Sequence, residues 1–338
     1  MKKKSIDKIN VAVIGLGFGL MHAEVYKKNK NCNLIYLCDL NKKHKKMSKK
    51  KFNCNFSINA NSIISNKNIN MISIASYDNC HYSQTLSALK NKKHVFVEKP
   101  LCQTYFELNN IKRELKKNKS IKFSSNFVLR AHPIFIKIFE LIKKNLIGKI
   151  YHIEGEYNYG RFNKITHGWR GKMPYYSVTQ GGGIHIVDLI HWYLNSKIHK
   201  VIAVENKLIS NRTQFRFPDT VTAIAKLHDG ATAKITSNFS CVTPHHHSLS
   251  VFGSKGTLIL SHKGLFFYKS RNKFVKPRKI NFKIKKDYKG KILESFISYV
   301  KHGSKKPIIL KQDALNSMSV CLAIDKSLKT KKWETVKY

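Results

Sequence analysis

A short apolar run, residues 11–14, leads directly into three closely spaced glycines, Gly15, Gly17 and Gly19. A strand that ends in such a turn and continues as a helix is typical of the βαβ unit that binds dinucleotides. Gly15 permits the tight turn, Gly17 lets a pyrophosphate approach the backbone, and the free N–H groups of the helix face the phosphates. The third glycine stands one residue early, because Leu20 occupies its usual place. A glycine-rich turn without a ligand is the alternative.

An acidic residue at the end of the second predicted strand supports the dinucleotide interpretation. Asp39 follows the strand 34–38 and lies 24 residues after Gly15. There a carboxylate accepts hydrogen bonds from both hydroxyls of the adenosine ribose and repels a 2′-phosphate. The sequence therefore favours NAD over NADP. Lys42 and Lys43 leave NADP open, because a nearby cation tolerates the extra phosphate.

The first 125 residues alternate strand-like and helix-like segments, which is the pattern of a parallel α/β sheet. The predicted strands are 10–14, 34–38, 71–75, 95–97 and 121–123, and the predicted helices are 21–30, 81–90 and 106–116. We therefore predict a Rossmann dinucleotide-binding domain over residues 1–125.

The second part of the chain, residues 126–338, has a different pattern. An amphipathic helix at 134–144, a strand at 151–159 and a helix at 185–194 precede a series of short alternating strands between 201 and 275. Turn dipeptides such as Asp229-Gly230 separate these strands, which indicates a mostly antiparallel sheet. Helices at 292–301 and 314–328 close the chain. We expect an α+β domain with a large open sheet over residues 126–338.

The charge of the chain first points to a nucleic-acid partner. The 338 residues include 63 Lys or Arg and 19 Asp or Glu, for a formal net charge of +44. Only eight of the basic residues are Arg, whereas bidentate recognition of bases and phosphates favours Arg. The lysines, with many Asn and Ile, match the residue bias of an AT-rich genome, so we predict no nucleic-acid partner.

Other compositional features indicate a cytoplasmic protein. No apolar run approaches the ~20 residues that a membrane helix needs, and the N-terminus has no signal-peptide pattern. The seven cysteines are odd in number and have no metal-ligand spacing, which is typical of reduced thiols. Three adjacent histidines, 245–247, do not change this, because neighbours on a strand point to opposite faces. We predict no metal site and no membrane partner.

The segment Glu98-Lys99-Pro100, placed after a short predicted strand, adds a second motif. Together with the glycine turn it resembles the glucose–fructose oxidoreductase and inositol dehydrogenase family, and the resemblance covers essentially the whole chain. Further matching segments are 74–76 with His81, 126–130, 169–170, 185–192 and 251–257. The resemblance implies NAD or NADP as cofactor and hydride transfer at a carbinol carbon of a sugar or polyol. It also implies that the second domain, residues 126–338, binds the substrate and forms the interface of a homodimer or homotetramer.

The resemblance makes Lys99 and His185 the catalytic candidates. Lys99 can stabilise negative charge on the reacting oxygen, and an imidazole with an ordinary pKa near ~6.5 can move a proton in either direction. Asp188 lies on the same helical face as His185. Relatives place an aspartate four residues before this histidine, whereas this chain has Gly181. Either another residue replaces that aspartate, or Lys99 and His185 act alone.

The remaining site residues also come from the resemblance. The cofactor-binding candidates are Gly15, Gly17, Phe18, Gly19, Asp39, Ser76, His81, Glu98, Lys99, Trp169 and Arg170. The substrate-binding candidates are Lys99, Arg130, Tyr175, Asp188 and His185, with Tyr176 and Arg161 as weaker ones. Three of these are among the few arginines, which bind anionic substrate groups or form structural salt bridges.

We therefore predict an NAD(P)-dependent oxidoreductase for a sugar, polyol or nucleotide-linked sugar. The segment 168–171 resembles the corresponding segment of family members that act in surface-polysaccharide synthesis, so we expect a role there. A non-catalytic dinucleotide-binding sensor or scaffold is the alternative: Lys99 and His185 argue against it, and Gly181 argues for it.

Overall fold

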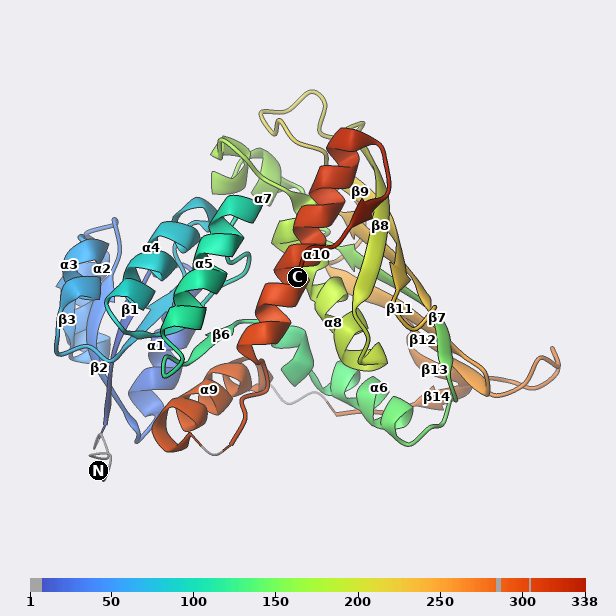
Figure 1. Cartoon of the computed structure of the whole chain (residues 1–338), viewed down its shortest axis with the longest axis horizontal. Coiled ribbons are helices and arrows are strands. Elements are labelled where there is room, and N and C mark those ends of the chain that lie inside the picture. Colours follow the sequence, from blue (N-terminus) through green and yellow to red (C-terminus); the bar gives the residue numbers. More distant parts are fainter. Residues whose placement is uncertain (1–7, 284–286, 304) are drawn as a thin grey trace. The chain divides into compact units, whose positions relative to one another are not determined.

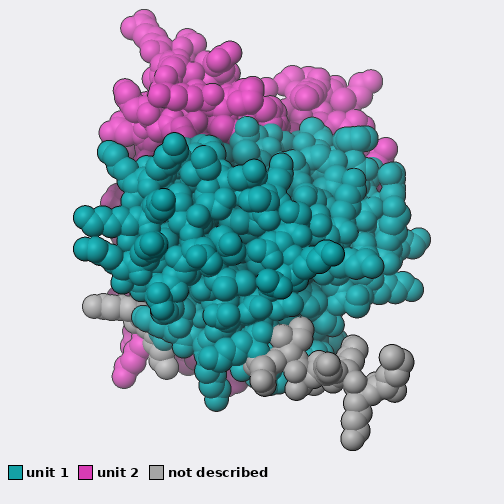
Figure 2. Space-filling view, turned by 90° about the vertical axis from the view of Figure 1, so that its left-hand side faces the viewer, with its two compact units in different colours: residues 1–131, 286–315 teal, residues 132–285, 316–338 magenta. Residues whose placement is uncertain are grey.

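The computed structural model describes residues 8–283, 287–303 and 305–338, which form two compact units. The first unit comprises residues 1–131 and 286–315, and the second comprises residues 132–285 and 316–338 (Figure 2). No helix in the described ranges combines the length and the hydropathy needed to span a bilayer.

The first unit is built on a six-stranded, fully parallel sheet in the order β3-β2-β1-β4-β5-β6 (Figure 1). Its strands are β1 (Ile9–Ile14), β2 (Cys32–Cys38), β3 (Asn55–Ser57), β4 (Met71–Ile74), β5 (His94–Val97) and β6 (Phe123–Ser125). The order reverses between β1 and β4, as in doubly wound sheets that bind ligands at this switch point. The predicted Rossmann fold is therefore confirmed.

Helices accompany the strands of this sheet, and the last of them comes from a distant part of the chain. They are α1 (Gly19–Lys28), α2 (His44–Met47), α3 (Ala60–Ser65), α4 (Asp78–Lys90), α5 (Tyr105–Lys117) and α9 (Lys291–His302). In the packed unit α4 lies beside α5, and α1 lies beside α9 (Figure 1). A capping box begins α5, because the Thr104 hydroxyl accepts from the Glu107 N–H and the Glu107 carboxylate accepts from the Thr104 N–H.

The first unit extends beyond the predicted boundary at residue 125 and takes in a distant part of the chain. It runs to residue 131 and includes 286–315, which the sequence pattern assigned to the second domain. The Phe96 and Phe296 rings pack with centroids 5.6 Å apart, and the Ser124 hydroxyl donates to the Ile309 carbonyl at 2.9 Å. Burial of the apolar face of α9 against β5 explains why this helix joins the Rossmann sheet.

The second unit contains a nine-stranded sheet in the order β14-β13-β12-β11-β7-β10-β9-β8-β15 (Figure 1). The strands are β7 (Ile150–Asn158), β8 (Ile198–Asn206), β9 (Thr220–Leu227), β10 (Thr232–Asn238), β11 (His246–Gly253), β12 (Gly256–Ser261), β13 (Gly264–Tyr268), β14 (Arg278–Ile280) and β15 (Glu334–Thr335). Only the pair β7–β10 among these is parallel. The predicted open, mostly antiparallel sheet is confirmed.

Helices α6 (Pro133–Lys143), α8 (Ile184–Leu194) and α10 (Lys311–Thr330) accompany this sheet, and α7 (Asn163–Thr166) is a single turn. The Tyr193 hydroxyl on α8 donates to the Phe135 carbonyl on α6 at 3.0 Å, and the Ser327 hydroxyl on α10 accepts from the Ala203 N–H on β8 at 3.1 Å. These contacts hold the helices on the sheet that positions His185.

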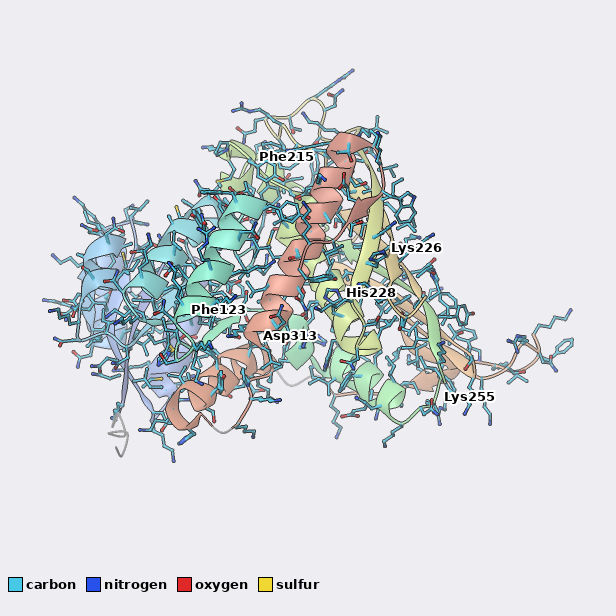
Figure 3. The ribbon with its side chains drawn as sticks, viewed as in Figure 1. Phe123, Phe215, Lys226, His228, Lys255 and Asp313 are labelled. Carbon is cyan, nitrogen blue, oxygen red and sulfur yellow. The ribbon has the colours of Figure 1, made fainter. Side chains whose placement is uncertain are left out.

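The lysines account for the charge at the surface of the molecule. Among the lysines that the structure describes, Lys93 is the buried one, and its ammonium donates to two backbone carbonyls at 2.7 and 2.8 Å. Others are exposed in turns, as Lys255 is, or on the outward face of a strand, as Lys226 is (Figure 3). The large positive charge is therefore a property of the solvated surface.

Candidate active site

Gly15 forms the turn between β1 and α1, in a conformation that would strain any residue with a Cβ. Its φ is +86°, in the left-handed region, and its N–H donates to the Cys38 carbonyl at 2.8 Å. A Cβ at this position would lie well inside 3.0 Å of the backbone of Ala75 and Ser76, at the end of β4. The turn therefore passes directly over the switch point of the sheet.

Gly17 and Gly19 serve different purposes in the same turn. Gly17 is exposed, and a Cβ there would meet nothing within 4 Å, which leaves the backbone open to a ligand. Gly19 is the first residue of α1, and its Cβ would lie 3.0 Å from Val13 and 3.2 Å from Ala75. The early third glycine thus still permits close packing of helix on sheet. Phe18 caps this helix and is half exposed.

Asp39 braces the glycine turn. One carboxylate oxygen accepts the Leu16 N–H at 2.7 Å, and the other accepts the Asn41 N–H at 2.8 Å. His44 Nδ1 lies 3.7 Å from the second oxygen. The carboxylate retains partial exposure at the end of β2. The pyrophosphate of NAD fits the open backbone at Gly17 and the N-terminus of α1 beside it. The ribose fits the carboxylate at the end of β2.

Glu98, at the end of β5, is buried in a hydrogen-bond network that lies inside the first unit. Its Oε1 lies 3.1 Å from Nε2 of His22 on α1 and accepts from the Asn126 amide at 2.7 Å. His22 Nδ1 lies 3.0 Å from the Ser73 hydroxyl. Burial by itself would raise the pKa of Glu98, but the hydrogen bonds and charge of His22, with Lys99 and Asn126, hold it below its ordinary value. A carboxylate therefore stands beside half-buried Lys99.

His81 also holds the loop that carries Lys99. The Lys99–Pro100 peptide is cis. His81 is buried, with Nδ1 2.7 Å from the Pro100 carbonyl and Nε2 3.1 Å from the Ser76 carbonyl. The Ser76 hydroxyl donates to Gln84 at 2.7 Å. His81 thus joins the loops after β4 and β5, and its predicted contact with a cofactor stays a prediction.

In the second unit, His185 lies in the first turn of α8, which follows a π-helical turn over Thr179–Gly183. The three glycines of this turn allow it to lie against bulky neighbours: Gly182 abuts Tyr157, and Gly183 abuts the Ser237 side chain. The His185 ring is buried and nearly parallel to Tyr157, with centroids 6.1 Å apart. Asp188, on the same helix, is fully buried.

An acid that sequence reasoning missed organises the loop before this turn. Asp325 on α10 accepts from the Tyr175 hydroxyl at 3.1 Å, the Ser177 hydroxyl at 2.8 Å and the Gln180 amide at 2.7 Å. Burial raises the pKa of Asp325 to about 6, against the effect of these donors. In the sequence, the feature that could have pointed to Asp325 is an acidic residue directly after the apolar run 320–324. The substrate contact of Tyr175 stays a prediction.

The candidate arginines have distinct surroundings. Arg130 is buried, and its guanidinium forms an ion pair with Asp313 at 3.2 Å, which is the structural alternative noted above. Arg161 lies over the Tyr159 ring at 5.6 Å. Arg170 stacks on Trp169 at 4.4 Å. The role of these three arginines toward a ligand stays a prediction.

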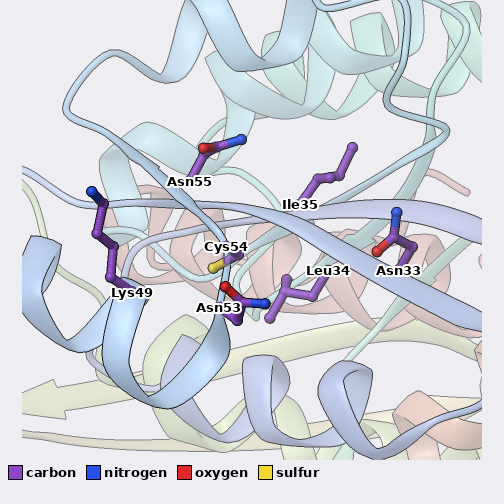
Figure 4. A pocket seen from close by; sticks show the side chains of 7 residues that line it. All are labelled: Asn33, Leu34, Ile35, Lys49, Asn53, Cys54 and Asn55. Carbon is purple, nitrogen blue, oxygen red and sulfur yellow. The ribbon is translucent and has the colours of Figure 1, made fainter.

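Metal binding and a separate surface hollow both bear on how these residues are interpreted. Within the described ranges, no group of three His, Cys, Asp or Glu side chains could hold a metal ion. A polar hollow of about 420 Å³ lies near the start of β2, and none of the candidate site residues lines it (Figure 4). Its lining residues are Asn33, Leu34, Ile35, Lys49, Asn53, Cys54 and Asn55. Burial raises the pKa of the Cys54 thiol to about 11, so this thiol is not activated.

Comparison with known proteins places both units in one family. Residues 9–127 match the oxidoreductase family with an NAD-binding Rossmann fold, and residues 135–259 match the GFO/IDH/MocA C-terminal domain. Myo-inositol 2-dehydrogenase of Thermotoga maritima is 25% identical over 259 residues, 74% of each chain. Glucose-6-phosphate 3-dehydrogenase of Bacillus subtilis is 25% identical over 277 residues, 78% of this chain and 75% of that one.

The solved structures show the same fold. Myo-inositol 2-dehydrogenase of Lactobacillus plantarum aligns with a TM-score of 0.81 at 20% identity, over 98% of this chain and 100% of that one. Scyllo-inositol dehydrogenase of Lactobacillus casei, with NAD(H) and scyllo-inositol bound, aligns with a TM-score of 0.76 at 19% identity, over 97% of this chain and 99% of that one.

Proposed function

The chain belongs to the GFO/IDH/MocA family of oxidoreductases with an NAD-binding Rossmann fold, and from this premise we propose that it is a dehydrogenase of a sugar, a polyol or a nucleotide-linked sugar. The reaction is hydride transfer at a carbinol carbon, with NAD rather than NADP as the preferred cofactor. Relatives named for myo-inositol and for glucose 6-phosphate support this substrate class.

The observation that carries the proposal is the Glu98 network. A buried carboxylate, held by His22 and Asn126, stands next to Lys99 at the end of β5, and β4 lies between β5 and the strand that leads into the glycine turn. A protein that only bound a dinucleotide would have little use for a braced lysine there, because the phosphate contacts come from the glycine turn and α1. The sensor or scaffold alternative therefore has less support than an enzyme.

In the proposed mechanism, bound NAD supplies the hydride acceptor for oxidation or, when reduced, the hydride donor. The Lys99 ammonium hydrogen-bonds the reacting oxygen and stabilises negative charge that develops there. His185 takes the hydroxyl proton during oxidation and returns it during reduction. Asp39 binds the hydroxyls of the adenosine ribose, and its charge disfavours a 2′-phosphate.

The positive charge of the chain also affects which substrates it would bind. A net charge of +44 favours anionic ligands such as sugar phosphates and nucleotide-linked sugars, with affinity that falls as salt rises. A role in surface-polysaccharide synthesis is compatible with such substrates. We extend the proposal to a cytoplasmic homodimer or homotetramer, which the seven free cysteines and the open sheet of the second unit support.

The test is a screen for cofactor reduction against sugars, polyols, sugar phosphates and nucleotide-linked sugars, with NAD and NADP in parallel. We expect turnover with NAD on at least one substrate. Lys99→Ala should retain NAD binding and lose turnover by about 100-fold or more. Wild-type turnover in Lys99→Ala would overturn the mechanism, whereas NAD binding without turnover on any substrate would favour the sensor.

A further inference from the structure

The space of the missing side chain at Gly181 is filled by the hydroxyl group of Tyr176. A Cβ on Gly181 would lie well inside 3.0 Å of both Oη and Cζ of Tyr176. The φ of Gly181 is outside the left-handed region, so the backbone itself does not demand glycine here. The glycine is instead explained by the phenol that occupies its side-chain position.

This position lies on the face of the helical segment that carries His185. Gly181 precedes His185 by four residues, and residues with this separation share one face of a helical turn. The Tyr176 oxygen therefore stands about one turn before His185, where a polar side chain at position 181 would place its own oxygen. The adjacent glycines turn toward the sheet, against Tyr157 and Ser237.

The Tyr176 oxygen is held in place by defined contacts. Arg170 Nε donates to it at 3.1 Å, and the guanidinium of Arg170 is stacked on Trp169. The Tyr176 ring meets Phe215 edge-on at 5.8 Å and Phe239 at 6.2 Å (Figure 3 marks Phe215). An oxygen that accepts from a cation is polarised, which strengthens its own O–H as a donor.

We propose that Tyr176 is a substrate-binding residue of the His185 site, in the place that position 181 leaves open. Its hydroxyl forms a hydrogen bond with one hydroxyl of the sugar or polyol, next to the oxygen whose proton His185 takes. Tyr176 keeps its own proton throughout, so the balance of the reaction is unchanged. The inference rests on the proposed function, which assigns a polyhydroxylated substrate to this site.

The first test is Tyr176→Phe, which removes one oxygen and retains the ring contacts with Phe215 and Phe239. We expect KM for the substrate to rise about 10- to 100-fold through loss of one hydrogen bond, with the Kd for NAD unchanged. The matched control is Tyr193→Phe on α8, the helix of His185, because it removes a buried hydroxyl that donates to the Phe135 carbonyl at 3.0 Å. This control should lower the thermal stability and leave KM as it is.

The second test uses substrate analogues that each lack one hydroxyl. In the wild-type enzyme, one of them should raise KM by about the factor that Tyr176→Phe does. In Tyr176→Phe that same analogue should cause no further loss, because the two changes remove the two ends of one hydrogen bond. A merely structural role for Tyr176 would not produce this pairing.

The third test moves the polar oxygen from the side chain of residue 176 to that of residue 181. Gly181→Asp alone should destabilise the protein, because its Cβ collides with the Tyr176 phenol. Tyr176→Ala combined with Gly181→Asp should recover affinity for substrate relative to Tyr176→Ala combined with Gly181→Ala, since only the former supplies an oxygen in that space.

The outcomes separate this inference from the proposed function. Active wild-type enzyme with an unchanged KM in Tyr176→Phe overturns the inference alone. An equal rise in the Kd for NAD would also overturn it, because the hydroxyl would then serve the cofactor or the fold. Wild-type protein that binds NAD and turns over no substrate instead overturns the proposed function.

Discussion

The Nε2 atom of His22 lies 3.1 Å from the Oε1 atom of Glu98, and this contact joins the helix after the glycine turn to the loop that carries Lys99. Both groups are buried, so water has little access to the contact. The NAD-binding turn and the proposed catalytic lysine are therefore held in one frame through side chains inside the Rossmann unit.

We expect His22→Ala to lower kcat about 10-fold or more, because a buried carboxylate that loses its partner shifts or takes up a proton. With less positive charge beside it the pKa of Glu98 should rise, so the kcat profile should gain an acidic limb. His22→Gln, which retains an amide donor, is the control and should recover most of the activity. A wild-type pH profile in His22→Ala would contradict this role.

The glycine turn predicts two different outcomes for two alanine substitutions. Gly15→Ala should destabilise the protein by about 2–5 kcal/mol, because a left-handed φ and a backbone collision both oppose the methyl group. Gly17→Ala should change stability by less than about 1 kcal/mol and weaken NAD binding at least about 10-fold, because its methyl group projects where the pyrophosphate approaches. Thermal unfolding and NAD titration measure the two effects.

Gly230 provides the control for Gly15. Its φ is +87°, almost the same as that of Gly15, but a Cβ there would meet nothing within 4 Å. Gly230→Ala should therefore cost about 1–2 kcal/mol from backbone conformation alone. Equal losses in the two variants would show that the close approach to Ala75 and Ser76 has no energetic effect.

Asp39→Asn should reduce the preference for NAD over NADP at least about 10-fold, because the variant removes the charge that repels a 2′-phosphate. The amide oxygen can still accept the Leu16 N–H, so the turn should persist. Asp39→Ala, which removes that acceptor, should weaken both cofactors. Isothermal titration with each dinucleotide gives the ratio, and an unchanged ratio in Asp39→Asn would assign Asp39 to the fold alone.

The raised pKa of Asp325 predicts a dependence of stability on pH. Because the folded state binds this proton more tightly than the unfolded chain, the group destabilises the fold increasingly as pH rises from about 4 to about 6. The effect should amount to at most about 3 kcal/mol. Asp325→Asn lacks it, so the difference in unfolding free energy between the two proteins should change over this interval and level off above it. A constant difference from pH 4 to pH 7 would contradict the assignment.

Local sequence was sufficient for the features that depend on a few neighbouring residues. The glycine turn, Asp39 and the strand before Glu98 follow from the steric demands of a strand-to-helix turn and from the alternation of buried strands with helices. The placement of Lys99 and His185 in one site came from the resemblance to the family and stays a prediction.

Only the tertiary structure decided the contacts between residues far apart in the chain. The return of α9 to the Rossmann sheet, the ion pair of Arg130 with Asp313 and the hydrogen bond of Tyr175 with Asp325, 150 residues away, have no local signature. Tyr176 lies near Gly181 in the sequence, but only the folded structure shows that its oxygen occupies the space of a side chain there. Local patterns report backbone geometry and burial, whereas partner choice depends on which surfaces the folded chain brings together.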